Sequence, residues 1–285
     1  MKILSFLFFF IPHPINIFLR SLLGQKVGVG AKIHIFSFIH CNRFIIGNHS
    51  SVSPFTILKA NSIELGSQTN ISPFTVIHSQ LIKGADLVLG DFSKIFPFCW
   101  LEPGEGIFIG KNVGIGGHTL IFTHGSWSNY LKGGPVSFGP VRIEDNVWIP
   151  WRVFIMPGVT IGSDSIIGAN STVTQSLGNN VLAAGSPAKV IKEKVNTGLS
   201  QREFDLRCED LLSNYSQFCQ RLGESENLTS KDVKFQDLNI SWGEGSTLLI
   251  DLEHKTFISN YGYDARRFIQ YLRRYGIRLN NGTAA

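Results

Sequence analysis

Three of the eight histidines in this 285-residue chain have spacings that could do chemistry. His78 lies 40 residues before His118, and His118 lies six residues before His124. Imidazole serves as a general base near neutral pH, and it is also the commonest zinc ligand in proteins. The spacing therefore leaves two kinds of site open, a zinc site with three histidine ligands or a single histidine that takes a proton from an acceptor.

Several familiar catalytic motifs are excluded. The chain contains no GxSxG, HExxH or GxGxxG sequence. Gly104 and Gly110 are separated by five residues rather than four, and no Ser or Thr follows Lys111, so this segment is not a P-loop. The cysteines form no CxxC pair, which argues against a zinc ribbon or a redox motif, and we predict reduced cysteines packed in a cytosolic protein. They are Cys41, Cys99, Cys208 and Cys219.

The composition predicts a folded protein rather than a disordered one. Hydrophobic residues make up 43% of the chain, charged residues only 16%, and the formal net charge is +5. Basic residues are scattered until a cluster at 266–274, so the charge does not predict a nucleic-acid partner. A solvated face, an anionic membrane surface or the phosphates of coenzyme A would explain the positive balance equally well.

A repeating step of six residues sets the expected fold. Segments 45–58, 63–78, 87–102 and 107–122 each carry an aliphatic residue, a glycine, two variable residues, a mostly small residue, one further residue and then another aliphatic residue. Gly162 follows Glu144 by 18 residues, which is three such steps and one triangular coil. Neither an amphipathic helix nor a hairpin sheet has this period. We therefore predict a mainly β protein, with a parallel β-helix over residues 27–194.

One coil is longer than the others. Gly110 and Glu144 occupy equivalent places but lie 34 residues apart, so about 16 residues must leave the β-helix. We predict a projecting loop over residues 123–141, with His124 near its start. Loops held by a rigid scaffold often carry function.

Both ends of the chain depart from the repeat. Residues 1–26 are apolar, but the run from Ile3 to Ile11 is shorter than the roughly 20 residues that span a bilayer, and no cleavage site follows. This segment is either a packing cap or a membrane-interface segment. Residues 195–285 predict a small α+β appendage, with a helix over 199–222, a hairpin over 247–259 and a helix over 264–276 that Gly276 ends.

The stretch from residue 118 to 194 contains GHTLIFTHGSW, NVWI, PGVTIG, IIGANSTVT and AAGSPAKVI in that order. It resembles the hexapeptide-repeat acyltransferases, especially the maltose, galactoside and nodulation-factor acetyltransferases. The resemblance is close over about residues 100–194 of the sequence. It implies a left-handed β-helix, a homotrimer, acetyl-CoA as acyl donor in a cleft between subunits, and no metal.

The same resemblance implies roles for individual residues. His124 stands at the place of the family's catalytic base, although Gly125 follows it where family members often have Asp. Glu102 and His118 are predicted to contact the acceptor. Residues predicted to contact the cofactor follow the family's groove and its phosphate-binding lysines. They are Trp148, Trp151, Ala169, Thr174, Lys189 and Lys192.

The sequence thus predicts an acetyl-CoA-dependent O-acetyltransferase of a sugar or a cell-surface polysaccharide precursor. It would act in the cytoplasm, at the inner face of the cell membrane if the N-terminus contacts lipid. Three alternatives remain. The acceptor could be an amine of an amino sugar or sugar nucleotide, or the chain could be an inactive scaffold. It could also be a zinc protein like the γ-type carbonic anhydrases, although their tail lacks the AAGSPAKVI sequence found here.

Overall fold

The computed structural model describes residues 8–126 and 129–222, and then residues 228–234, 237–242, 246–251, 256–259, 263–275, 277 and 279. The chain divides into two compact units, Met1–Asn196 and Thr197–Ala285, and each is described by itself. The division lies two residues beyond the end predicted for the β-helix.

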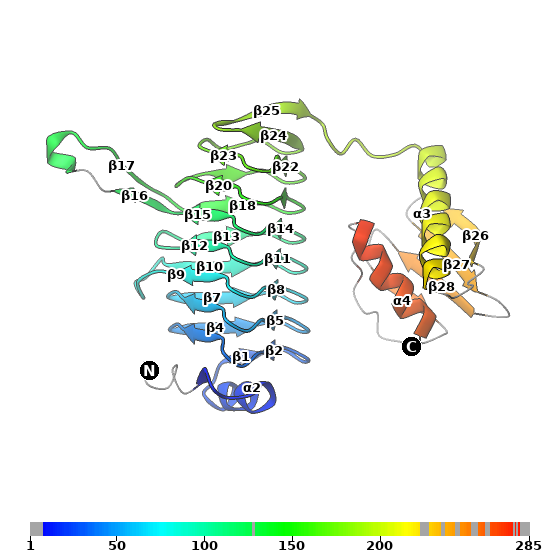
Figure 1. Ribbon diagram of the computed structural model, residues 1–285, viewed down its shortest axis with the longest axis horizontal. Coiled ribbons are helices and arrows are strands. Elements are labelled where there is room, and N and C mark those ends of the chain that lie inside the picture. The colour runs from blue at the N-terminus through cyan, green and yellow to red at the C-terminus, as the bar shows by residue number, and fades with distance from the viewer. Residues whose placement is uncertain are drawn as a thin grey trace. The chain divides into compact units, whose positions relative to one another are not determined.

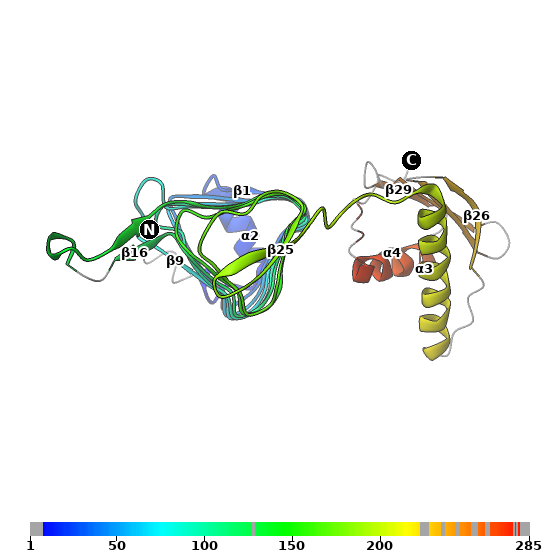
Figure 2. The ribbon, with the colours of Figure 1, turned by 90° about the horizontal axis from the view of Figure 1, so that it is seen from above.

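The first unit is a left-handed parallel β-helix of triangular section (Figures 1 and 2). The first sheet consists of β1 (Lys26–Val27), β4 (Arg43–Ile46), β7 (Ser62–Leu65), β10 (Asp86–Leu89), β13 (Ile107–Ile109), β18 (Val141–Ile143) and β21 (Thr160–Ile161). The second consists of β2 (Lys32–Ile33), β5 (Ser51–Val52), β8 (Asn70–Ile71), β11 (Lys94–Ile95), β14 (Gly114–Ile115), β19 (Trp148–Ile149), β22 (Ile166–Ile167), β24 (Val181–Gly185) and the antiparallel β25 (Ala188–Glu193). The third consists of β3 (Phe38–His40), β6 (Ile57–Lys59), β9 (Val76–His78), β12 (Trp100–Glu102), β15 (Leu120–Phe122), β20 (Phe154–Ile155) and β23 (Thr172–Val173). The predicted fold class is confirmed.

Each sheet contributes a stack of aliphatic side chains to the core. On the second sheet the stack is in register from coil to coil and is fully buried. Its members are Ile33, Val52, Ile71, Ile95, Ile115 and Ile149. Because neighbouring strands lie about 4.8 Å apart, each side chain contacts those directly above and below it. Six residues therefore carry the chain from one side of the triangle to the next.

The repeating glycines lie at the corner between the first and second sheets. A Cβ atom at Gly47 would lie 2.5 Å from the carbonyl carbon of Gly66, and one at Gly90 would lie 2.5 Å from that of Gly110. Successive corners stack directly on each other, so a side chain there would collide with the backbone of the next coil.

The edge between the second and third sheets carries a ladder of aromatic rings, which we call the aromatic edge. Its members are Phe36, Phe55, Phe74, Phe98, His118 and Trp151. Consecutive ring centroids lie 5.5, 5.4, 5.1, 5.0 and 5.9 Å apart. The first five have φ between 58° and 64°, a conformation that is costly for side chains other than glycine. Ring stacking offsets part of that cost.

The predicted loop over residues 123–141 is a β-hairpin. It consists of β16 (His124–Ser126), a short 3₁₀ helix, η1 (Tyr130–Lys132), and β17 (Val136–Phe138), which pairs antiparallel with β16. It extends away from the β-helix (Figure 1). The Gly139 amide donates to the Thr123 carbonyl at 3.0 Å and closes its base. We call this edge, between the third and first sheets, the hairpin edge.

The helix α2 (His13–Leu22) covers the N-terminal end of the β-helix (Figure 1). Two of its polar residues face inward, since Asn16 and Arg20 are buried and Arg20 Nε donates to Asn16 Oδ1 at 2.7 Å. Three of its apolar residues face outward, and Ile15, Phe18 and Leu22 are each more than half exposed. Within the described residues, no helix combines the length and hydropathy needed to cross a bilayer.

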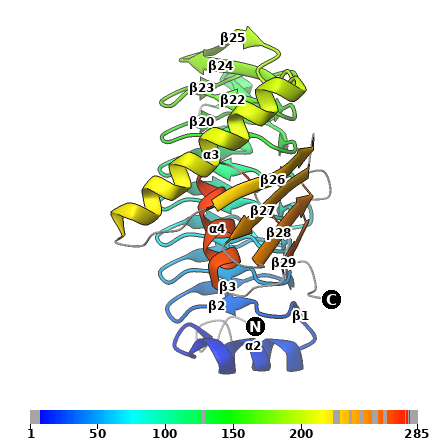
Figure 3. The same cartoon turned by 90° about the vertical axis from the view of Figure 1, so that its right-hand side faces the viewer.

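The second unit contains two helices and a four-stranded antiparallel sheet (Figure 3). In chain order its elements are α3 (Gln201–Arg221), β26 (Leu228–Lys234), β27 (Asp237–Trp242), β28 (Ser246–Asp251), β29 (Thr256–Ser259), α4 (Tyr263–Leu272) and η2 (Arg273–Tyr275). A capping box between Ser200 and Glu203 begins α3. The predicted hairpin is β28–β29, while β26 and β27 were missed, and Gly276 lies outside the described residues.

Candidate active site

A histidine and a glutamate meet at the base of the hairpin. His124 Nδ1 lies 2.6 Å from Glu102 Oε2. Glu102 ends β12 and His124 lies two residues beyond the end of β15, and these two strands are neighbours in the third sheet. The His124 side chain is 43% exposed, whereas that of Glu102 is only 14% exposed. We call this pair the dyad.

Thr123 holds the dyad in place. It is fully buried, and its hydroxyl donates toward the Glu102 carbonyl at 2.8 Å and Glu102 Oε2 at 3.1 Å. The same oxygen accepts from the Glu105 amide at 2.9 Å. A Cβ atom at Gly104 would lie 2.8 Å from Glu102 Oε1, so glycine leaves room for the carboxylate. The Thr123 hydroxyl and the His124 ring therefore hold one oxygen of the Glu102 carboxylate, and Gly104 leaves space for the other.

This arrangement determines what His124 can do. A carboxylate can only accept a hydrogen bond, so it favours the imidazole form that carries its proton on Nδ1. That form leaves the lone pair on Nε2, the nitrogen that does not face Glu102. The dyad therefore suits a general base acting on a group outside the β-helix.

The structure places the Glu102 carboxylate against His124, and the predicted contact of Glu102 with the acceptor stays a prediction. The sequence contains a signal for the contact with His124. Glu102 pairs with Phe122 across the third sheet, so a residue that leaves the strand just after Phe122 must pass close to Glu102. The order of coils alone did not reveal it, because the direction of the hairpin was unknown.

The other two histidines lie elsewhere. His118 belongs to the aromatic edge, where its ring stacks on Phe98 at 5.0 Å. His78 ends β9, and its Nε2 lies 3.4 Å from Lys59 Nζ. In the described part of the chain, which includes all three histidines, no group of three or more His, Cys, Asp or Glu residues could hold a metal ion. The geometry thus gives no support to the zinc alternative.

The predicted cofactor residues lie on the later coils and are exposed or partly exposed. Trp148 lies on β19, with its ring over Gly114, and Trp151 lies at the aromatic edge with its ring over Gly117. Ala169 and Thr174 are exposed one coil further on. Lys189 and Lys192 are exposed on β25, where they pair with Ala184 and Leu182. The structure therefore gathers these six residues toward the C-terminal end of the β-helix, whereas His124 lies at the hairpin edge.

The cysteines are packing residues, as predicted. All four are buried, and none of them forms a disulfide. Burial raises the pKa of the Cys41 thiol to about 12 and that of Cys99 to about 11, so neither is a ready nucleophile.

Comparison with known proteins agrees with this fold. Residues 140–175 match the family Bacterial transferase hexapeptide (six repeats). The galactoside O-acetyltransferase of Escherichia coli is 35% identical over 143 residues, covering 40% of this chain and 70% of that protein. The galactoside O-acetyltransferase of Lactococcus lactis is 40% identical over 92 residues, covering 32% of this chain and 44% of that protein. The chain belongs to the hexapeptide-repeat acetyltransferases, and the predicted family is confirmed.

The extent of the match varies between relatives. The chain spans 44% of the length of a Schizosaccharomyces pombe relative that is 42% identical over 92 residues. Among solved structures, an acetyl-coenzyme A complex of a hexapeptide-repeat acetyltransferase from Vibrio cholerae is 30% identical with a TM-score of 0.37, covering 52% of this chain and 69% of that chain. A maltose O-acetyltransferase from Clostridium difficile is 31% identical with a TM-score of 0.39, covering 44% of this chain and 66% of that chain.

Proposed function

We propose that this chain transfers an acetyl group from acetyl-CoA to a hydroxyl group of a carbohydrate, with His124 as the general base. The observation that carries the proposal is the 2.6 Å contact between His124 Nδ1 and Glu102 Oε2, which leaves Nε2 to accept a proton. Membership of the hexapeptide-repeat acetyltransferases supports the reaction class. The galactoside O-acetyltransferases among its relatives support a sugar acceptor.

The reaction needs one base and no covalent enzyme intermediate. The acceptor hydroxyl attacks the thioester carbonyl, a C–O bond forms, and the hydroxyl proton moves to His124 Nε2. The tetrahedral intermediate then collapses, the C–S bond breaks, and His124 returns the proton to the sulfur of coenzyme A. Glu102 stabilises the imidazolium ion that exists between these two steps.

The donor site is proposed on the later coils. Lys189 and Lys192 would pair with the phosphates of coenzyme A, and the rings of Trp148 and Trp151 would line the pantetheine groove with Ala169 and Thr174. Because the predicted cofactor residues other than Thr174 lie on the second sheet or at the aromatic edge, whereas His124 lies at the hairpin edge, we propose that a neighbouring subunit of a homotrimer completes the cleft. An apolar surface for that contact lies on the outer face of the third sheet, where three large side chains are exposed, Ile57, Trp100 and Leu120. Sedimentation of the full chain should report three copies, and an active monomer would contradict this proposal.

The N-terminal helix supports a position at the inner face of the membrane. An ordinary surface helix buries its apolar residues, whereas α2 buries Asn16 and Arg20 and exposes Ile15, Phe18 and Leu22. We expect Phe18→Ser with Leu22→Ser to reduce flotation with liposomes, and the control Phe138→Ser, an exposed residue of the hairpin, to leave it unchanged. Equal flotation of all forms would leave α2 as a cap alone.

An acceptor screen tests the proposed function. Purified full-length protein is incubated with acetyl-CoA and a panel of sugars, amino sugars and sugar nucleotides, and products are read by the mass of one added acetyl group. Treatment with hydroxylamine distinguishes the two possible linkages, because it removes an O-acetyl ester and leaves an N-acetyl amide. An ester product that requires enzyme supports the proposal. An amide product from an amino sugar would show the alternative N-acetyltransferase activity.

A further inference from the structure

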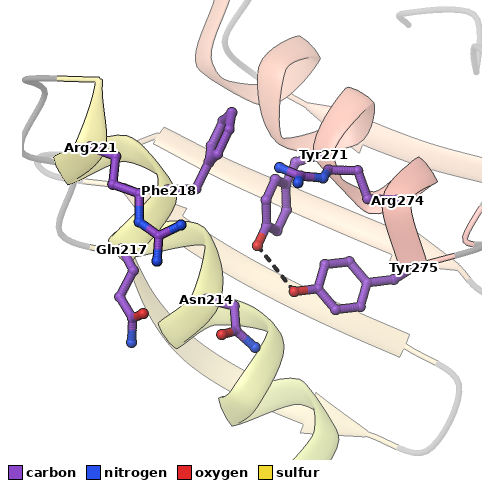
Figure 4. Close-up of a pocket in the computed structure, with 7 residues that line it drawn as sticks. All are labelled: Asn214, Gln217, Phe218, Arg221, Tyr271, Arg274 and Tyr275. Atoms are coloured by element: carbon purple, nitrogen blue, oxygen red, sulfur yellow. Dashed lines mark hydrogen bonds between the residues drawn. The ribbon is translucent and has the colours of Figure 1, made fainter.

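The C-terminal unit contains a cavity of about 360 Å³. One wall belongs to α3, from which Asn214, Gln217, Phe218 and Arg221 line the cavity (Figure 4). The other wall belongs to the end of α4 and to η2, from which Tyr271, Arg274 and Tyr275 line it. The cavity has the size of a small-molecule site.

The α3 residues share one face of the helix, because they occupy positions i, i+3, i+4 and i+7. Other positions of the helix pack into the core of the unit, where Leu211, Tyr215 and Cys219 are buried against Phe268 and Leu272. The polar residues at the cavity are thus not needed for the core, and α3 presents them to a space that a ligand could fill.

Two positive charges border this space. The Arg274 guanidinium carbon lies 5.3 Å from the centre of the Phe218 ring and 5.5 Å from that of Tyr271, so two rings hold it. Arg221 borders the cavity from α3. Neither arginine forms an ion pair with a carboxylate in the part of the chain that the structure describes, and no lining residue is acidic. The charge therefore favours an anionic ligand.

The lining also offers uncharged hydrogen-bonding groups. The hydroxyls of Tyr271 and Tyr275 lie 3.1 Å apart (Figure 4). Burial, together with the hydrogen bond to Tyr275, raises the pKa of Tyr271 to about 12, so the Tyr271 phenol keeps its proton near neutral pH. One of the two hydroxyl hydrogens forms the hydrogen bond between the tyrosines, and the other can be donated to a ligand. The amides of Asn214 and Gln217 both donate and accept, which suits the hydroxyl groups of a sugar.

We propose that this cavity binds an acidic sugar unit of the acceptor glycan, with its carboxylate between Arg221 and Arg274. The Tyr275 ring, 47% exposed, offers an apolar surface for the ring of the sugar. The identity of the ligand as a carbohydrate rests on the proposed function, whereas the preference for an anion rests on the two arginines. The C-terminal unit would then recognise the glycan that the β-helix unit acetylates.

Binding measurements on the full-length protein without acetyl-CoA test this proposal. Calorimetry would use acidic oligosaccharides of hyaluronan, polygalacturonate and polysialic acid, neutral maltohexaose, glucose 1-phosphate and inorganic phosphate. We expect an acidic oligosaccharide to bind and maltohexaose to give no signal. Arg221→Gln with Arg274→Gln should weaken binding about 10- to 100-fold, since hydrogen bonds to charged groups are lost. The matched control Arg202→Gln with Arg207→Gln makes the same change in charge on exposed positions of α3 outside the cavity and should stay within about twofold.

Three results would overturn the proposal. The first is that no acidic oligosaccharide binds. The second is that both double variants, each verified as folded by circular dichroism, weaken binding equally, which would indicate general charge attraction. The third is that inorganic phosphate or glucose 1-phosphate binds more tightly than any acidic oligosaccharide, which would indicate a phosphate site. Binding is also measured with His124→Asn, which should not transfer acetyl groups. We expect this variant to bind the acidic oligosaccharide as the parent does, so glycan binding is tested separately from the proposed transfer reaction.

Discussion

The two edges of the third sheet carry two histidines only six residues apart in very different surroundings. At the aromatic edge, His118 takes the place of a phenylalanine, and its ring lies between Phe98 and Trp151. At the hairpin edge, His124 faces the carboxylate of Glu102. One imidazole continues an apolar ladder, and the other is polarised by a charge.

The difference shows how a repetitive scaffold gains a specific site. The aromatic edge repeats because every coil there has the same backbone conformation, with φ near 60° from Phe36 to His118. The hairpin edge does not repeat from coil to coil, because about 16 extra residues leave one coil there, and Thr123 anchors them through the Glu102 carbonyl. The interruption of the repeat, rather than the repeat itself, creates the candidate active site.

The largest expected effect separates the two histidines. His124→Asn removes the proposed base while keeping size and polarity, so turnover should fall about 10²- to 10⁴-fold with little change in affinity for acetyl-CoA. His118→Asn disturbs only ring stacking, so we expect it to cause a smaller loss of turnover than His124→Asn. Steady-state kinetics on an acceptor from the screen checks both variants. Equal losses would remove the functional distinction between the edges.

The second effect concerns Glu102. Glu102→Gln removes the charge that favours the Nδ1–H form of His124, and we expect turnover to fall about 10- to 100-fold. The Michaelis constant for acetyl-CoA should stay close to that of the parent, since Glu102 contacts His124 and not the donor. Glu105→Gln is the matched control, an exposed glutamate three residues away that should keep parent activity. If Glu102→Gln turns over at the rate of the parent, the contact between Glu102 and His124 is structural and not catalytic.

A smaller effect is expected away from both edges, on β25. Lys189→Ala with Lys192→Ala should raise the Michaelis constant for acetyl-CoA about 10-fold, because charge-assisted bonds to phosphate are lost. The salt dependence of that constant should weaken as well. Lys111→Ala with Lys132→Ala, which removes two lysines outside the predicted donor site, serves as the control. An unchanged constant in a folded variant would exclude these lysines from the donor site.

The smallest effect on activity should come from the aromatic edge. Phe74 stacks on Phe55 and Phe98, so Phe74→Ala should lower stability by about 1–3 kcal/mol, from two ring pairs worth about 0.5–1.5 kcal/mol each. Urea unfolding of parent and variant measures the change, and turnover should remain near the parent value. A large loss of turnover with unchanged stability would place function at the aromatic edge too.

The β-helix was predictable because buried residues such as Ile71 and Ile95 recur with a fixed period, which depends only on local geometry. The projecting segment was predictable from its excess length, but its hairpin was not, since β16 is fully exposed and shows no burial pattern. His124 was identified by resemblance, whereas its partner required the register of β12 and β15. The aromatic edge was missed because Phe55 and Phe74 occupy corner positions that composition alone assigns to small residues.

If Glu102 acts through His124, the effects of substituting the two residues are coupled, and a double-mutant cycle measures that coupling. Turnover is measured for the parent, Glu102→Gln, His124→Asn and the double variant on one acceptor at saturating acetyl-CoA. We predict that Glu102→Gln lowers turnover about 10- to 100-fold in the parent but less than about twofold when His124 is already Asn. An equal loss in both backgrounds would show that the two residues act independently, and it would contradict the dyad as the catalytic unit.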